Sequence, residues 1–234
     1  MASTVTIAQA AAADLPTLAH IMPLAMQADL INRTLFPDSI YDLTLTSKAL
    51  LSSYEADFRK PNMHFFKATD NATGEIVGFG NLSFVDNAAS AAVPLTETAE
   101  KSEPPSPPEG MNMVFAGRLF GSLAAKRIRH MSAYSRYVAW YGLHVVPTHQ
   151  RRGIGSALLK YGLDMLGAGA LPVWLSTQMR GRNLYLKWGF EDVDSLDIDL
   201  KEFGGEWSGY GVHRSPCMLR MPGGTNTAEN LKPK

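Results

Sequence analysis

The feature that most constrains the fold is one continuous segment, Leu143–Ser156, with the sequence Leu-His-Val-Val-Pro-Thr-His-Gln-Arg-Arg-Gly-Ile-Gly-Ser. A nearly continuous apolar run, Tyr137–Val146, leads into it and ends at a proline, and such a run predicts a buried strand. Two glycines then open an amphipathic stretch, Gly153–Leu166, which we predict to be a helix. A strand, a short loop and a helix in this order are typical of an α/β protein.

The loop between this strand and this helix has the residues of an anion site. Glycines at the start of a helix let a ligand approach the backbone closely. The free N–H groups of the first helical turn, together with the helix dipole, favour a negative charge there. Arg151 and Arg152 add formal charge and forked donors. The residues at 150–156 therefore predict a bound phosphate or pyrophosphate.

Two common phosphate motifs do not fit this loop. A P-loop needs Gly-Lys-Ser/Thr after a spacer, which the chain lacks. A dinucleotide-binding fingerprint needs a third glycine, but that position is Leu158. A third pattern matches: Gln150-Arg-Arg-Gly-Ile-Gly155 resembles the Gln/Arg-x-x-Gly-x-Gly/Ala pyrophosphate loop of the GNAT superfamily of N-acetyltransferases.

Two flanking blocks extend this resemblance. Leu143-x-Val145-x-Pro147 is similar to the end of the family's fourth strand, and Leu184-Tyr185-x-x-x-Gly189-Phe190 resembles the family's Leu-Tyr-x-x-x-Gly-Phe helix. The resemblance is clear for residues 137–191 and only topological for residues 1–85. It implies an α/β fold with a mixed, mostly antiparallel central sheet that is flanked by helices and splays apart between strands 4 and 5.

The resemblance also implies acetyl-CoA as the acyl donor, held in the gap between those two strands. Backbone groups of Leu143, His144 and Val145 would hold the pantetheine arm. The pyrophosphate would lie on the loop, which comprises Gln150, Arg151, Arg152, Gly153, Ile154, Gly155 and Ser156. Members of this family transfer the acetyl group directly to an amine, so Cys217 is not needed as a nucleophile, and we expect it to be an ordinary buried residue.

Three residues are candidates for the chemistry. Tyr185 occupies the position from which relatives donate a proton to the departing thiolate; the alternative is that it only packs. The predicted strand holds no carboxylate, and its only titratable side chains are Tyr141 and His144. His144 is a candidate general base or a core histidine, and its side chain points away from those of its strand neighbours. Tyr141 is a candidate acceptor-site residue. A water relay, or an amine that binds neutral, would need no base.

The acceptor pocket of this family is formed by the first two helices and by loops near the last two strands. Candidates here are Met26, Phe36, Tyr41, Trp207 and Tyr210, and the glycine- and aromatic-rich segment 204–211 is a candidate substrate cover. Three functions stay open. The first, which we favour, is acetylation of the primary amine of a small molecule. The second is acetylation of a protein N-terminus or lysine. The third is a non-catalytic acyl-CoA-binding sensor.

The rest of the chain completes one predicted domain over residues 1–222. Residues 86–110 hold five acids and five prolines and predict a long acidic insertion, and residues 223–234 predict a flexible tail. We expect Pro23 to end or kink the first helix. The other predicted helices lie near 30–36, 46–58, 113–129 and 180–188, and the other strands near 5–8, 64–69, 76–84, 171–176, 191–200 and 212–221.

Charge and composition limit the kinds of partner and ligand that we expect. Lys+Arg and Asp+Glu both number 22, so the chain carries no net charge and is not expected to bind nucleic acid. Residues 110–163 hold eight basic and no acidic side chains, which suggests a small anionic ligand or simple neutralisation by the acidic insertion. A single cysteine argues against a disulfide framework or a cysteine-rich zinc site, and we expect no metal.

The hydropathy of the chain and its first residues indicate a compartment. The longest uncharged run has 15 residues, shorter than the about 20 that span a bilayer, so no membrane association is expected. No basic, apolar leader begins the chain. We therefore expect a cytoplasmic protein, with the nucleus left open, and a homodimer also stays open.

Overall fold

The computed structural model describes residues 4–37, 43–87, 110–167, 171–203 and 211–223. In chain order the elements are β1 (Val5–Gln9), α1 (Leu15–Met26), α2 (Leu30–Leu35), α3 (Leu43–Phe58), β2 (Met63–Asp70), β3 (Ile76–Asp86), α5 (Met113–Met131), β4 (Arg136–Val145), α6 (Ile154–Asp164), β5 (Val173–Ser176), α7 (Met179–Leu186), β6 (Glu191–Asp199) and β7 (Val212–Arg220). Short 3-10 helices lie at Ala12–Asp14, Pro147–His149 and Leu200–Phe203.

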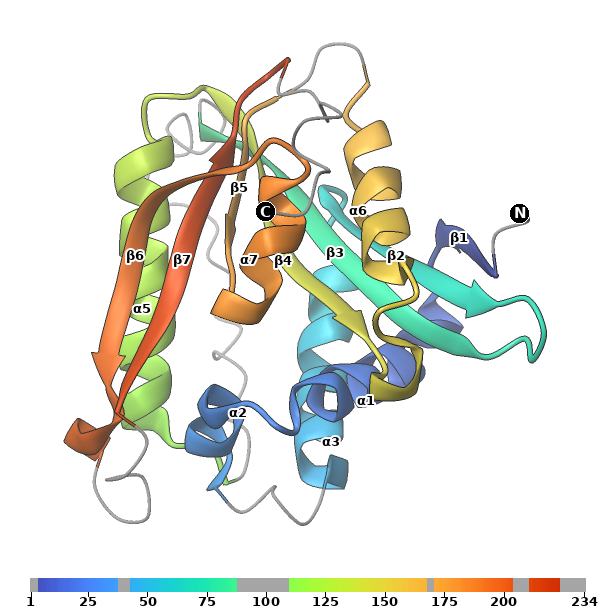
Figure 1. Cartoon of the computed structure of the whole chain (residues 1–234), viewed down its shortest axis with the longest axis horizontal. Coiled ribbons are helices and arrows are strands. Elements are labelled where there is room, and N and C mark those ends of the chain that lie inside the picture. Colours follow the sequence, from blue (N-terminus) through green and yellow to red (C-terminus); the bar gives the residue numbers. More distant parts are fainter. Residues whose placement is uncertain (1–3, 38–42, 88–109, 168–170, 204–210, 224–234) are drawn as a thin grey trace.

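The strands form one seven-stranded sheet in the order β1-β2-β3-β4-β5-β7-β6. Among the described strands, β4 and β5 form the one parallel pair, and every other neighbouring pair is antiparallel. Helices α6 and α7 lie on one face of the sheet, and α1, α3 and α5 lie on the other (Figure 1). The predicted mixed, mostly antiparallel sheet flanked by helices is therefore confirmed.

The sheet opens between β4 and β5. These strands pair through only three residue pairs, the last of which is Trp140↔Leu175. Strand β5 ends one residue later, at Ser176, whereas β4 continues to Val145 while still paired with β3. The edge of β4 beyond Trp140 therefore faces a gap, as the splayed sheet predicted from the resemblance requires.

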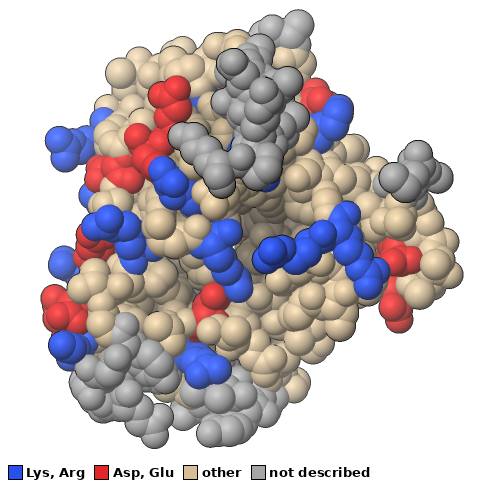
Figure 2. All heavy atoms as spheres, in the orientation of Figure 1, with Lys and Arg blue, Asp and Glu red and all other residues tan. Residues whose placement is uncertain are grey.

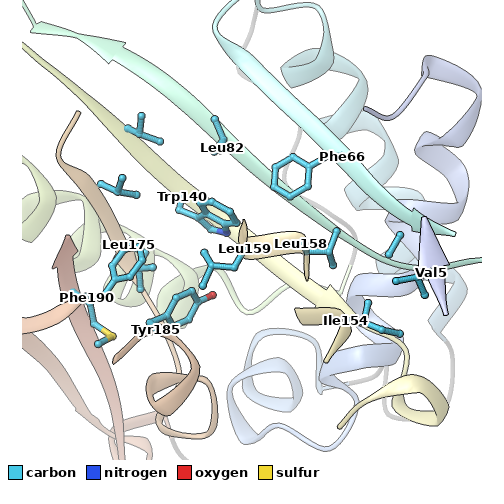
Figure 3. Close-up of a cluster of buried hydrophobic side chains, with 14 of the residues drawn as sticks. Val5, Phe66, Leu82, Trp140, Ile154, Leu158, Leu159, Leu175, Tyr185 and Phe190 are labelled. Atoms are coloured by element: carbon cyan, nitrogen blue, oxygen red, sulfur yellow. The ribbon is translucent and has the colours of Figure 1, made fainter. Parts of the chain in front are cut away.

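A central apolar cluster holds β4 in place against α6 (Figure 3). Trp140 of β4 and Phe66 of β2 meet edge to face with ring centroids 5.6 Å apart. Leu158 and Leu159 of α6 are fully buried against them. Burying four large apolar side chains of this kind contributes about 1.5–3 kcal/mol each. Both sides of the strand-loop-helix segment are therefore anchored in the core.

Most predicted elements are present, with ends that differ by a few residues. The first helix does not end at Pro23, because α1 continues to Met26; a kink at this proline stays a prediction. Pro23 removes one intrahelical hydrogen bond. Pro23 and Ala25 are both buried, so packing of the last turn offsets that loss. The acidic segment 88–109 and the tail from 224 lie outside the described residues.

Candidate active site

A cavity of about 280 Å³ lies where β4 and β5 separate. Figure 2 shows a hollow at the centre of one face, with lysine and arginine side chains on both sides of it. Its apolar wall comes from α1, α2 and α5, and includes Met22, Met26, Ile31, Leu35, Leu119 and Phe120. Its polar groups include Tyr141, His144, Arg180, Tyr185, His213 and Ser215. Among the described lining residues there is no aspartate or glutamate.

A β-bulge in β4 decides which side chains face this cavity. Asn81 of β3 pairs with Gly142, but Leu82 pairs with Trp140, so Tyr141 is the extra residue. The Trp140 indole N–H donates to the Gly142 carbonyl at 2.9 Å, which holds the bulge closed. Because one residue is inserted, the side-chain alternation of the strand reverses beyond it. Leu143 then packs into the same apolar cluster as Trp140.

The reversal places His144 on the opposite face, beside α1. Its ring lies 5.1 Å from that of Phe79, and it lines the cavity. Burial, and secondarily the positive charge of Arg180, lower the pKa of His144 to about 4. The imidazole is therefore neutral at pH 7 and a weak proton acceptor. Its predicted orientation, opposite to Leu143 and Val145, is what the structure shows.

Tyr185 reaches the cavity from α7, on the other side of the gap. Only 7% of the residue is exposed, and its ring packs 5.5 Å from Phe190. Figure 3 shows its hydroxyl at the end of the ring away from Phe190, on the side of Leu159. Burial raises the pKa of the hydroxyl well above its usual value. Tyr185 is therefore a protonated phenol at the wall of the cavity.

Tyr141, the bulged residue, lies at the mouth of the cavity and is 50% exposed. Its hydroxyl accepts a hydrogen bond of 2.9 Å from Nη1 of Arg127 on α5. This contact connects β4 to α5 across the opening. Tyr141 is thus positioned to contact a molecule that enters the cavity, whereas His144 and Tyr185 lie deeper in it.

The loop that precedes α6 has an open, cation-flanked backbone. Gly153 adopts a left-handed conformation at the helix N-cap, with φ of +80°, and a Cβ there would meet nothing within 4 Å. Gly155 packs closely, because a Cβ there would lie 3.4 Å from Leu184 of α7. Arg151 and Arg152 are exposed. The first-turn N–H groups of Ile154, Gly155 and Ser156 therefore begin a helix whose N-terminus has room for an anion.

The Gln150 side chain forms a hydrogen bond within the protein. Its side-chain amide donates to the Val145 carbonyl at 2.9 Å, so it ties the loop to the end of β4. His149, a neighbouring loop residue, pairs with Asp70 of β2 at 3.3 Å. The side chains of both residues are therefore directed to neighbouring strands, and the loop is held from both sides.

The eight basic residues of 110–163 do not gather at one point. Lys126 pairs with Asp194 at 2.8 Å and Lys160 with Asp164 at 2.6 Å. Only Arg151 and Arg152 belong to the anion loop. The expected acidic partner segment lies outside the described residues.

The residues expected to form the acceptor pocket differ in where they lie. Met26 lines the cavity. Phe36 does not line the cavity but is buried in the apolar cluster that forms part of its wall, together with Ile31 and Phe115. Tyr41, Trp207, Tyr210 and nearly all of the 204–211 segment fall outside the described residues.

Several lining residues were not found from the sequence. Arg180, at the start of α7, pairs with Asp29 at 2.5 Å and so connects α7 to the α1–α2 corner. His213 and Ser215 come from β7, and Leu119 and Phe120 come from α5. No motif surrounds these residues, and only the i, i+2 spacing of a histidine and a serine in a predicted strand marked the β7 pair as sharing a face.

In the described ranges, no group of three or more histidine, cysteine, aspartate or glutamate side chains could hold a metal ion. Over the same ranges, no helix combines the length and the apolar character needed to cross a membrane.

Comparison with known proteins agrees with this geometry. Residues 29–190 match the model described as the acetyltransferase (GNAT) family. No curated protein sequence matches significantly.

Solved structures with the same fold include three enzymes of low sequence identity. A putative arylalkylamine N-acetyltransferase 7 from the mosquito Aedes aegypti has a TM-score of 0.60 at 14% identity, covering 92% of this chain and 86% of its own. A histone acetyltransferase HPA2 and related acetyltransferase from Corynebacterium glutamicum has a TM-score of 0.56 at 17% identity, with 94% and 97% covered. The ribosomal-protein-S18-alanine N-acetyltransferase of Escherichia coli has a TM-score of 0.52 at 18% identity, with 97% and 99% covered.

Proposed function

Because the chain belongs to the GNAT family of acetyltransferases, we propose that it moves the acetyl group of acetyl-CoA directly to the primary amine of a small molecule with an apolar body. One observation carries this proposal. The cavity of about 280 Å³ has an apolar wall, lacks carboxylates among its described lining residues, and meets the β4–β5 gap at Tyr185. Small-molecule sites are concave and mostly apolar, with a few polar groups.

The donor side of the proposal rests on the gap and the loop. The edge of β4 beyond Trp140 carries backbone groups of Leu143, His144 and Val145 that are suited to hold an extended pantetheine arm, with the Val145 carbonyl already hydrogen-bonded to the Gln150 side chain. The loop at 150–156 offers first-turn N–H groups and two exposed arginines to the pyrophosphate. The gap and the loop adjoin, because the loop follows β4 directly.

Direct transfer agrees with the position of the one cysteine. Cys217 is fully buried among Trp174, Met131 and Ala139, away from the lining of the cavity. Burial raises the pKa of its thiol to about 11, so it is not a thiolate at neutral pH. A reactive cysteine needs the opposite environment.

We assign the general acid to Tyr185. As the amine nitrogen bonds to the acetyl carbon, the carbon–sulfur bond breaks and the phenol gives its proton to the departing sulfur. A phenol with a raised pKa donates to a thiolate only over a short distance, and Tyr185 lines the cavity at the gap, where that sulfur would arrive. His144, with a pKa of about 4, is a poor acceptor of the amine proton.

A thiol-release assay tests the proposal. The protein is mixed with acetyl-CoA and, in turn, phenethylamine, aniline, spermidine, an amino acid and a peptide with a free N-terminus. The proposal predicts the highest kcat/KM with phenethylamine or aniline. Preference for the peptide would support the protein acetyltransferase, and binding of acetyl-CoA without transfer to any amine would support the sensor.

A further inference from the structure

Two polar residues of β7 face the same cavity from the side opposite β4. His213 and Ser215 stand two positions apart, so they share one face of the strand. The Nε2 atom of His213 lies 3.0 Å from Oγ of Ser215. Ser215 is only 5% exposed, and both residues line the cavity. An imidazole held by a buried hydroxyl therefore faces the space where the proposed acceptor enters.

We propose that His213 is the general base of the transfer, with Ser215 as the residue that fixes its ring. This inference rests on the proposed function, because it names the group that accepts the acceptor's proton at that same site. In this role the neutral imidazole would carry its proton on Nε2 and donate it to Ser215 Oγ, so that Nδ1 is the nitrogen that takes the proton of the amine. The apolar wall of α2 and α5 then holds the body of the amine beside the imidazole.

The charges around the two cavity histidines favour His213. For His144, burial and the cationic Arg180 act in the same direction, and both oppose protonation. Burial also lowers the pKa of His213, but the Asp197 carboxylate on the adjacent strand β6 partly opposes this lowering. His213 therefore has a nearby negative charge that favours its protonation, whereas His144 has none among the described residues.

Other charged groups near His213 belong to several elements. Arg214 follows it on the opposite face of β7 and pairs with Asp197 at 2.6 Å. Lys126 of α5 acts on the same carboxylate. Across the cavity lie Arg180 and Tyr185 of α7, with His144 on β4.

The proton balance of the step closes without an added reagent. The N–C bond forms as the amine nitrogen attacks the carbonyl carbon, and the N–H proton passes to His213. The C–S bond then breaks, and the sulfur takes the proton of Tyr185. Imidazolium and phenolate return to their starting forms by exchange with solvent, so the net change is one proton moved from nitrogen to sulfur.

The test compares kcat/KM for acetyl transfer to phenethylamine in wild type, His213→Gln and Ser215→Ala. His20→Gln is the matched control, because His20 is an exposed histidine of α1 outside the cavity. We expect His213→Gln to lower kcat/KM about 100-fold with unchanged acetyl-CoA affinity, and Ser215→Ala to cause a smaller loss. His20→Gln should behave as wild type. Added imidazole should partly restore transfer in His213→Ala.

A pH profile separates a base from a packing residue. Wild type should show a rise of kcat/KM with pH whose midpoint does not move when phenethylamine is replaced by aniline, and His213→Gln should lack that rise. If His213→Gln keeps the wild-type kcat/KM, or if its acetyl-CoA affinity falls as much as its kcat/KM, then His213 is not the general base, while the proposed function stands. Failure of the wild-type protein to acetylate any amine overturns the proposed function as well.

Discussion

Replacing Tyr185 with phenylalanine separates chemistry from packing in one substitution. The ring is 7% exposed and packs against Phe190, so phenylalanine keeps that contact. Within the described part of the chain the hydroxyl has no hydrogen-bond partner, so its loss leaves no group unsatisfied. We expect the free energy of unfolding to change by less than about 1 kcal/mol. Tyr185→Ala, which removes the buried ring, should cost about 3–5 kcal/mol.

The effect on catalysis should be far larger than the effect on stability. A positioned general acid contributes about 10²–10⁴-fold, which is roughly 3–5 kcal/mol of transition-state stabilisation at about 1.4 kcal/mol per tenfold. The assay measures kcat/KM by thiol release, acetyl-CoA affinity by calorimetry and stability by thermal unfolding. A Tyr185→Phe protein that keeps the wild-type rate and affinity would show that Tyr185 only packs.

Two further predictions concern the donor site, and a third concerns the ion pair between Asp194 of β6 and Lys126 of α5. Gly155→Val should lower acetyl-CoA affinity at least about tenfold (roughly 1.4 kcal/mol), since its Cβ would already lie 3.4 Å from Leu184 and 3.9 Å from Leu143, so the added methyl groups would push the first turn of α6 away from α7 and β4; a folded variant with wild-type affinity contradicts the placement of the pyrophosphate. Arg152→Ala should weaken acetyl-CoA binding several-fold at low salt and less at high salt, because salt screens exposed charges. Calorimetry at two ionic strengths measures this difference. An equal loss of affinity at both ionic strengths would indicate that Arg152 acts through packing. The hydrogen bond from Lys126 is the main cause that lowers the pKa of Asp194 to about 2. Because this pKa in the folded protein lies below the pKa in the unfolded chain, the ionised carboxylate stabilises the folded state above about pH 4. This stabilisation is lost as the pH falls toward 2. Thermal unfolding of Asp194→Asn should then show a weaker acid dependence between these values, and an unchanged one refutes the linkage.

The parts of the site that could be predicted from the sequence lie next to one another along the chain. The strand, the loop with Gly153 and Gly155, and the following helix lie within one segment, so local residue types were enough to predict them. The position of Tyr185 followed from the family's motif. The orientation of His144 relative to its neighbours followed from strand alternation alone.

What could not be predicted depends on contacts between distant segments. The bulge at Tyr141 appears only in the register of β4 against β3, and it decides which face His144 occupies. The cavity joins α5 and β7 to β4, so Phe120 and His213 become neighbours of the site only once the sheet has formed. The continuation of α1 through Pro23 likewise depends on burial of its last turn, which overrides the local preference of proline.

We propose that the β4–β5 gap and the loop at 150–156 hold acetyl-CoA. Calorimetric titration of the purified protein with acetyl-CoA, with CoA as the comparison, tests this placement. We expect one site with a dissociation constant in the low micromolar range, about −8 kcal/mol. A folded protein that releases no binding heat with either ligand, and shows no shift in thermal unfolding, would contradict it.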